Sequence, residues 1–195
     1  ESPTLKIVDI VGVRPDRGNN PALRTAMNEL DEMIGLERVK EDIIRIEKLA
    51  LTNYDRELRG EEPDAIPLNR VFLGNPGTGK TTVAKLYGRI LKALGLLTKG
   101  EYELKQPSDL IGAHAGDTEK RTSGLVKRCT GKVLIIDEAY GLGNSTYGKT
   151  AIDTLVGLVH GYPGEDIAVI MIGYAIPMKK MFRECNPGLQ GRFDL

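Results

Sequence analysis

The sequence contains no tryptophan, and only 5% of its 195 residues are aromatic. Proteins that bind single-stranded nucleic acid stack bases on aromatic side chains along a basic groove. Basic and acidic residues balance here at 27 each, and no basic run is interleaved with aromatics. We therefore expect no nucleic-acid partner, and the lack of net charge gives no general attraction to an anionic membrane.

Cysteine is also scarce. Cys129 and Cys185 lie far apart without metal-ligand spacing, which favours two reduced thiols in an intracellular, cytoplasmic protein. No apolar run approaches the roughly 20 residues that span a bilayer, and no signal-peptide pattern opens the chain, so we expect no membrane partner. The first residue is Glu1 rather than methionine, and we expect a fragment or a processed piece.

Apolar runs alternate with helical patterns along most of the chain. Residues 5–13 look strand-like but isolated, and the linker-like "RPDRGNNP" follows them. Strands are expected at residues 70–73, 102–104, 132–138 and 167–174, with helices at 81–97, 120–129 and 151–159 between them. Fully apolar strands alternating with helices predict an α/β fold, a parallel sheet covered on both faces. We expect a terminal segment and linker over 1–28, and a nucleotide-binding domain over 29–195.

The stretch "VFLGNPGTGKTTVAK" matches G-x-x-x-x-G-K-[ST] in full, through Gly74, Gly79, Lys80 and Thr81. A strand precedes it and a helix follows, as a phosphate-binding loop requires, whereas a plain turn would not need the lysine. Glycines let backbone N–H groups approach a polyphosphate, and the helix N-terminus adds positive charge. The predicted nucleotide-binding residues are Gly74, Asn75, Pro76, Gly77, Thr78, Gly79, Lys80, Thr81 and Thr82.

Two acids end the apolar run "KVLIIDEAY". Ligands of open α/β sheets bind at the carboxyl ends of the strands, where the glycine-rich loop is also expected. Asp137 is placed to hold Mg²⁺ together with Thr81, and Glu138 to activate an attacking water. The alternative is that the two acids merely cap a turn. A water-activating glutamate favours hydrolysis over phosphate transfer to another substrate.

Several motifs in order resemble the AAA+ ATPases of the CbbX-like group, which holds red-type Rubisco activases and relatives of stage V sporulation protein K. They are "LDEMIGLERVKEDI", "LGNPGTGKTTVAKLYGRILKALGLL", "IDEAYGL", "AIDTLVGL" and "NPGLQGRF". The resemblance implies a P-loop core of five parallel strands with a helical lid after it. It also implies ATP hydrolysis at subunit boundaries of a ring, usually a hexamer, that remodels a protein partner in the manner of a chaperone.

The resemblance adds roles for single residues. Ile34 and Gly35 match the segment that lies against adenine, although an ordinary helix start with a buried isoleucine is the alternative. Arg192 in "GRF" matches an arginine finger that reaches the neighbouring subunit's site, against the alternative of a surface arginine.

The sequence also departs from the family pattern. His114 stands where a pore-loop aromatic is usual, which favours an exposed loop residue over a substrate-gripping one. Tyr174 stands where many AAA+ proteins have an asparagine or threonine that polarises water, and Gln190 replaces an arginine of the activases. The helical lid is expected to be missing from this chain.

Four functions remain open at this point. The leading hypothesis is an ATPase that remodels a protein partner. A nucleotide-binding scaffold with little turnover is the second, favoured by the departures at His114, Tyr174 and Gln190. A GTPase ranks low because "DLIG" is not accompanied by a guanine-reading N-K-x-D. A phosphotransferase ranks low because Glu138 indicates water as the acceptor.

Overall fold

The computed structural model of the chain describes residues 12–75, 77, 79–160 and 164–193. Its centre is a parallel sheet of four short strands in the order β1-β4-β3-β2. The strands are β1 (Arg70–Leu73), β2 (Tyr102–Lys105), β3 (Val133–Ile136) and β4 (Ala168–Gly173). In the registered pairs, Arg70 lies opposite Ile170 and Val133 opposite Ala168. Both central strands are buried throughout, which explains their uninterrupted apolar sequences.

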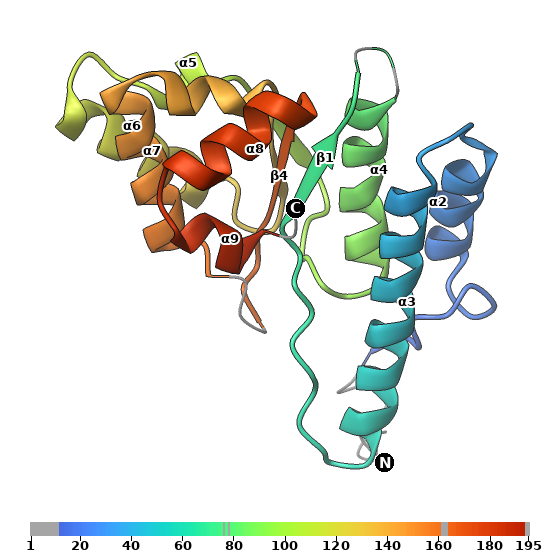
Figure 1. The fold of residues 1–195 in the computed structure, drawn as a ribbon. Coiled ribbons are helices and arrows are strands. Elements are labelled where there is room, and N and C mark those ends of the chain that lie inside the picture. Colours follow the sequence, from blue (N-terminus) through green and yellow to red (C-terminus); the bar gives the residue numbers. More distant parts are fainter. Residues whose placement is uncertain (1–11, 76, 78, 161–163, 194–195) are drawn as a thin grey trace.

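Helices cover both faces of this sheet (Figure 1). One layer holds α2 (Pro21–Glu32), α3 (Glu37–Leu58) and α4 (Lys80–Ala93). The other holds α5 (Pro107–Leu110), α6 (Ala115–Arg128), the 3₁₀ helix η1 (Ala139–Asn144), α7 (Thr146–Leu158), α8 (Ala175–Glu184) and α9 (Gly188–Arg192). Alternate residues of β3 enter the two separate cores, Ile135 on the α4 side and Leu134 on the α7 side. The predicted α/β class, with helices on both faces, is confirmed.

The prediction of five strands is not met in the described part of the chain. β1, β3 and β4 coincide with apolar runs of the sequence and β2 with the short segment "YEL", whereas the fifth strand was implied only by the family resemblance. Most of the strand-like segment at 5–13 lies outside the described residues. After β4, the described residues form the helices α8 and α9.

The domain boundary expected at residue 28 falls inside α2 and is corrected by the structure. Pro21 begins the helix instead of prolonging the linker, because the Asn20 side chain accepts a hydrogen bond from Leu23 N at 3.1 Å and caps the first turn. Leu23 and Met27 are fully buried in the α4-side core. Residues 21–28 therefore belong to the folded domain.

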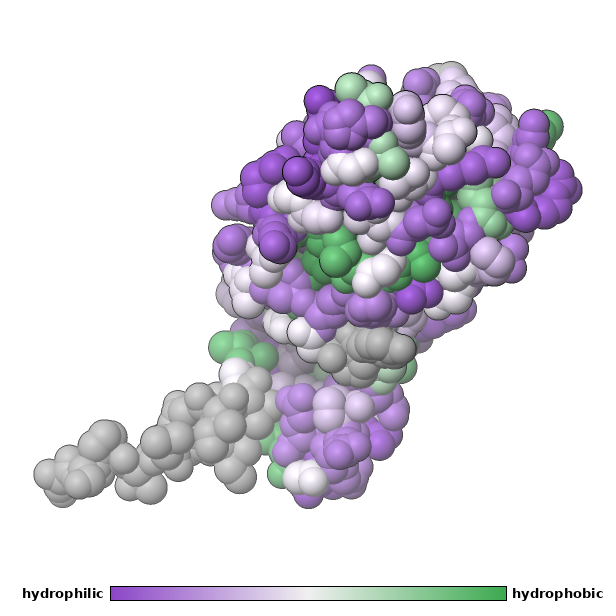
Figure 2. All heavy atoms as spheres, turned by 90° about the vertical axis from the view of Figure 1, so that its left-hand side faces the viewer, coloured by the Kyte–Doolittle hydropathy of each residue, from purple (hydrophilic) through white to green (hydrophobic). Residues whose placement is uncertain are grey.

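The outer surface of the α5–α8 layer is mostly hydrophilic and carries small apolar patches (Figure 2), as is usual for a surface in contact with water. Cys129 and Cys185 are both free thiols, as predicted. None of the helices in the described residues combines the length and the apolar character needed to cross a membrane.

Candidate nucleotide-binding site

The glycine-rich loop connects β1 to α4 at the carboxyl end of the sheet (Figure 1). Gly77 and Gly79 have φ values of 74° and 79°, a left-handed conformation that strains other residues. Gly79 is the N-cap of α4 and offers no side chain to the first turn, so backbone N–H groups of that turn point toward the loop. The predicted Pro76 and Thr78 lie outside the described residues.

Lys80 is buried at the start of α4, and its ammonium group turns back into the loop. Its Nζ donates to the backbone oxygens of Gly74 and Asn75, at 3.0 and 2.5 Å. A cation thus lies in the loop that leads into a helix N-terminus, and the two together attract an anion.

Asp137 and Glu138 follow β3 directly, beside this loop. Asp137 Oδ1 accepts a hydrogen bond from the backbone N–H of Glu138 at 2.9 Å. Glu138 has a φ of 49° and an exposed side chain. A left-handed conformation in a glutamate is uncommon, and it turns the chain from β3 into η1 at the mouth of the site.

A pocket of about 550 Å³ brings these parts together. Of the predicted residues, it is lined by Gly74, Gly77, Gly79, Lys80, Thr81, Thr82, Asp137, Glu138 and Tyr174. Gln106 and Tyr140 also line it, and the sequence reasoning missed both. The signal for Gln106 was its place just after β2, at the same edge of the sheet as the loop. In the described residues there is no cluster of three or more His, Cys, Asp or Glu side chains suited to a metal.

Two tyrosines form one wall of this pocket. The rings of Tyr140 and Tyr174 lie with centroids 5.8 Å apart and planes tilted by 35°. The Tyr140 ring also touches the end of β4, because a Cβ on Gly173 would lie 2.9 Å from its Cδ1. Burial, and then the negative charge of Glu138, raise the pKa of the Tyr140 hydroxyl.

Ile34 and Gly35 lie in the turn between α2 and α3, outside the residues that line the pocket. Their neighbours nevertheless reach the loop, since a Cβ on Gly79 would lie 3.3 Å from Met33 Cε and 3.6 Å from Leu36 Cδ1. Ile34 is 99% exposed, so the alternative of a buried isoleucine at a helix start is wrong.

Arg192 is not brought into the pocket of its own chain. It lies on α9, where its Nε donates to Val159 O at 2.8 Å and its NH1 to Gly188 O at 3.1 Å. His114 is exposed and caps α6, with its Nδ1 accepting from Asp117 N at 3.2 Å. Gln190 is exposed on α9.

The comparisons with known proteins agree with this site. Residues 70–195 match the model of the family described as "ATPase family associated with various cellular activities (AAA)". Stage V sporulation protein K of Bacillus subtilis is 38% identical over 89% of this chain and 54% of the relative. Protein CbbX of Cereibacter sphaeroides is 38% identical over 87% of this chain and 56% of the relative.

A more distant likeness concerns the fold alone. The crystal structure of the FIGL-1 AAA domain in complex with ADP matches with a TM-score of 0.54 and 21% identity, over 84% of this chain and 52% of that one. The chain spans about half the length of the first two relatives. The AAA match covers both the glycine-rich loop and the two acids after β3, and the chain therefore belongs to the AAA family of ATPases.

Proposed function

We propose that this chain binds ATP with Mg²⁺ in the pocket between the glycine-rich loop and β3, and hydrolyses it. Hydrolysis would drive the remodelling of a protein partner by a ring oligomer, expected to be a hexamer. The observation that carries the proposal is the meeting of Lys80, Asp137 and Glu138 at one pocket, from segments far apart in the sequence.

The phosphates would bind where Lys80 and the first turn of α4 concentrate positive charge. In the structure, Lys80 Nζ is held by two backbone oxygens of its own loop, and phosphate oxygens would replace these partners. The lining glycines would let backbone N–H groups of the loop approach the phosphates. Asn75, Pro76, Thr78 and Thr82 would complete the loop around the phosphates.

Thr81 and Asp137 fit Mg²⁺ because both supply the hard oxygen ligands that this ion prefers, and both line the pocket. The phosphates and water would complete the coordination, which explains why no protein-only cluster is needed. When bound, the ion would neutralise developing charge on the phosphates.

Glu138 is the proposed general base for the attacking water, since its side chain is exposed at the pocket mouth. Tyr174 would contact the nucleotide from the end of β4. Ile34 and Gly35 would cover the adenine, because an isoleucine that is 99% exposed beside the loop gains by burying itself against an apolar ring.

Arg192 is proposed to act on the site of a neighbouring subunit, since it lies outside its own pocket. To do so, its guanidinium must exchange the carbonyls of Val159 and Gly188 for a phosphate. The same two hydrogen bonds favour a second candidate function. If Arg192 stays bound to its own subunit, the chain acts as a nucleotide-binding scaffold with little turnover.

The protein partner is not identified by the relatives. The name of one relative refers to sporulation and that of another to a secretion system. The second is ESX-3 secretion system protein EccA3 of Mycobacterium tuberculosis, and the match covers 27% of the length of EccA3. What these relatives share with this chain is the aligned segment, which in this chain overlaps the AAA match. The free thiols of Cys129 and Cys185 fit a reducing compartment, and we place the protein in the cytoplasm.

The test is phosphate release from ATP as a function of protein concentration, with Glu138→Gln as the control. Specific activity that rises with concentration and disappears in the variant supports hydrolysis at a site completed by a neighbour. Negligible activity at every concentration, with nucleotide still bound, supports the scaffold instead. Loss of nucleotide binding altogether contradicts both.

A further inference from the structure

The sheet ends in an open edge at β2, which is the last strand in the order. The backbone oxygens of Glu101 and Lys105 accept from Val133 N and Asp137 N of the β3 segment, both at 2.8 Å. In a parallel sheet, the backbone N–H and C=O groups of alternate residues point toward the neighbouring strands on opposite edges. The backbone groups of Tyr102 and Leu104 therefore face away from β3. No hydrogen bond to these groups occurs among the described residues. An edge of this kind is a template for another strand.

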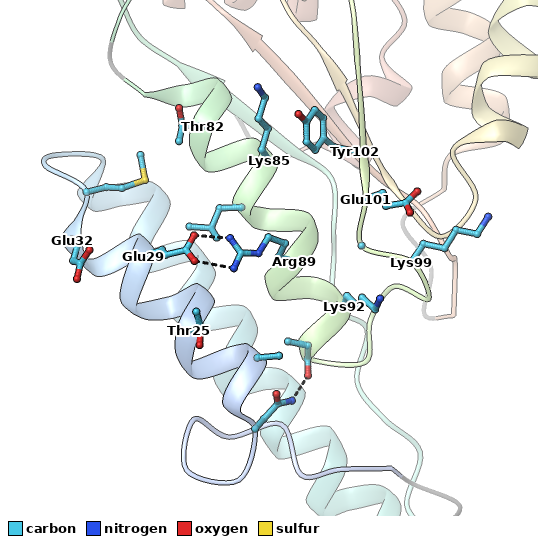
Figure 3. Close-up of a pocket in the computed structure, with 16 residues that line it drawn as sticks. Thr25, Glu29, Glu32, Thr82, Lys85, Arg89, Lys92, Lys99, Glu101 and Tyr102 are labelled. Carbon is cyan, nitrogen blue, oxygen red and sulfur yellow. Dashed lines mark hydrogen bonds and ion pairs between the residues drawn. The ribbon is translucent and has the colours of Figure 1, made fainter.

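A wide groove lies beside this edge (Figure 3). It has a volume of about 1410 Å³ and is bounded by α2, by the outer side of α4 and by residues 99–102. Its volume is well above the 550 Å³ of the nucleotide pocket. The side chains of Tyr102 and Leu104 are each 42% exposed. Tyr102 lies on the α4 side of the sheet, with its ring centroid 5.2 Å from Lys85 Nζ, so both side chains lie on the side of the sheet that faces the groove.

The groove has an excess of unpaired positive charge. Arg89 is already neutralised by Glu29, through contacts of 2.6 and 2.9 Å that Figure 3 marks. Glu101 lies 3.5 Å from Lys132.

The lining lysines are Lys85, Lys92 and Lys99, and none of them has a carboxylate within 4.0 Å in the part of the chain that is described. Glu32 is the remaining acid of the lining. Lysines without a carboxylate partner in a groove are complementary to carboxylates brought by a ligand.

We propose that this groove, together with the free edge of β2, binds an extended acidic segment of a protein partner, which pairs with β2 as an added strand. The open edge supplies backbone hydrogen bonds, and the lysines supply contacts for acidic side chains on the side of the sheet where Tyr102 and Leu104 lie. The inference goes beyond ATP hydrolysis and does not depend on it, because the lysines of the groove do not line the nucleotide pocket.

A nucleic acid fits the groove less well. Glu29, Glu32 and Glu101 line it and would repel a phosphodiester chain. Among the described residues that line it, Tyr102 is the single aromatic side chain, whereas single-stranded nucleic acids are bound by stacking on several. A protein segment can use the edge of a strand, which a nucleic acid cannot.

The probe is a fluorescein-labelled peptide of about eight residues, the length of an ordinary strand, in which glutamate alternates with valine. Binding is followed by fluorescence anisotropy against the same peptide with lysine in place of glutamate. An oligothymidine of about 12 nucleotides tests the nucleic-acid alternative. We expect the acidic peptide alone to bind, and binding to weaken as salt is added.

The charge is tested with Lys85→Glu combined with Lys92→Glu. The matched control is Lys120→Glu combined with Lys127→Glu, which reverses two exposed lysines of α6 on the other face of the sheet. Affinity for the acidic peptide should fall by about tenfold in the first variant, equivalent to about 1.4 kcal/mol, and stay unchanged in the second. Equal affinities in the two variants would overturn the proposal.

Strand pairing is tested on the unmodified protein with two N-methylated versions of the acidic peptide. One carries N-methyl groups on its odd residues and the other on its even residues, so only one of them blocks the edge that faces β2. One version should bind like the parent peptide and the other should not. Equal binding of both, or preferred binding of oligothymidine, contradicts the proposal. A third outcome would also contradict the proposal: the peptide does not bind, and the chain self-associates whereas the variant with Lys85→Glu and Lys92→Glu does not. The groove would then bind a second copy of this chain.

Discussion

Helix α4 carries Lys80 and Thr81, and its position depends on a glycine in its middle. Gly88 is buried where α4 meets the turn before β2, and a Cβ added there would lie 2.5 Å from the backbone oxygen of Gly100 and 3.1 Å from Val133 Cγ2. The turn cannot easily retreat, since the N–H groups of Lys99 and Gly100 both donate to Gly131 O, at 3.0 and 2.9 Å. We therefore predict that Gly88→Ala destabilises the protein.

The magnitude follows from two opposing effects. Alanine in place of glycine favours a helix by about 1 kcal/mol, whereas forcing a methyl group into a packed contact costs about 1–3 kcal/mol, and more when the neighbour is backbone. Gly124→Ala in α6 is the matched control, because its Cβ would meet nothing closer than the end of Arg128 at 3.7 Å. The control should gain up to about 1 kcal/mol, and the Gly88 variant, which has the same helix gain but also the packing cost, should lie about 1–3 kcal/mol below it.

Urea unfolding followed by circular dichroism measures both values. Because α4 would have to shift, the Gly88 variant should also bind ATP more weakly than the Gly124 variant. A Gly88 variant that is as stable as the Gly124 variant would refute the close approach of α4 to Gly100.

Further predictions concern the site and one buried thiol. Lys80→Ala should weaken ATP binding about 10- to 100-fold, since a charged hydrogen bond is worth about 1.5–3 kcal/mol, and titration with a fluorescent ATP analogue measures this. Glu138→Gln should leave that binding intact and slow phosphate release about 10²–10⁴-fold, the usual contribution of a general base. Arg192→Ala should reduce turnover without weakening ATP binding. If the arginine acts on a neighbouring subunit, mixing this variant with the Glu138→Gln protein should restore part of the ATPase activity. No restored activity would place the effect of Arg192 within one subunit. Burial raises the pKa of Cys129 from 9.0 to about 11, so between these pH values the folded state keeps a proton that the unfolded chain releases. The free energy of unfolding should therefore fall as the pH rises from 9 to 11. The urea concentration at the midpoint of unfolding should fall less over that range in Cys129→Ala.

The sequence predicted the parts of the structure that depend on local pattern. The glycine-rich loop and the acids after β3 lie at one pocket because parallel strands bring their carboxyl ends to one edge. Apolar runs of the sequence indicated β1, β3 and β4. Tyr140 escaped notice because its place depends on the tertiary contact with Gly173 and Tyr174. The boundary at residue 28 was misjudged for a related reason, since Pro21 can end a linker or begin a helix, and only the packing of Leu23 and Met27 decides. The hydrogen bonds of Arg192 to carbonyls of its own subunit had no signal in the sequence.

Helix α4 contributes residues to both the nucleotide pocket and the groove. Thr82 lines both the nucleotide pocket and the groove, and the contact of Gly88 with the Gly100 turn leaves little room for α4 to move without the segment that leads into β2. A strand added to β2 would press on this turn and on α4, whose first residue is Lys80. Coupling between binding sites is reciprocal. Saturating ATP should therefore change the affinity of the Glu138→Gln protein, which does not consume the nucleotide, for the acidic peptide, and an affinity that ATP leaves unchanged would show that α4 does not couple the pocket to the groove.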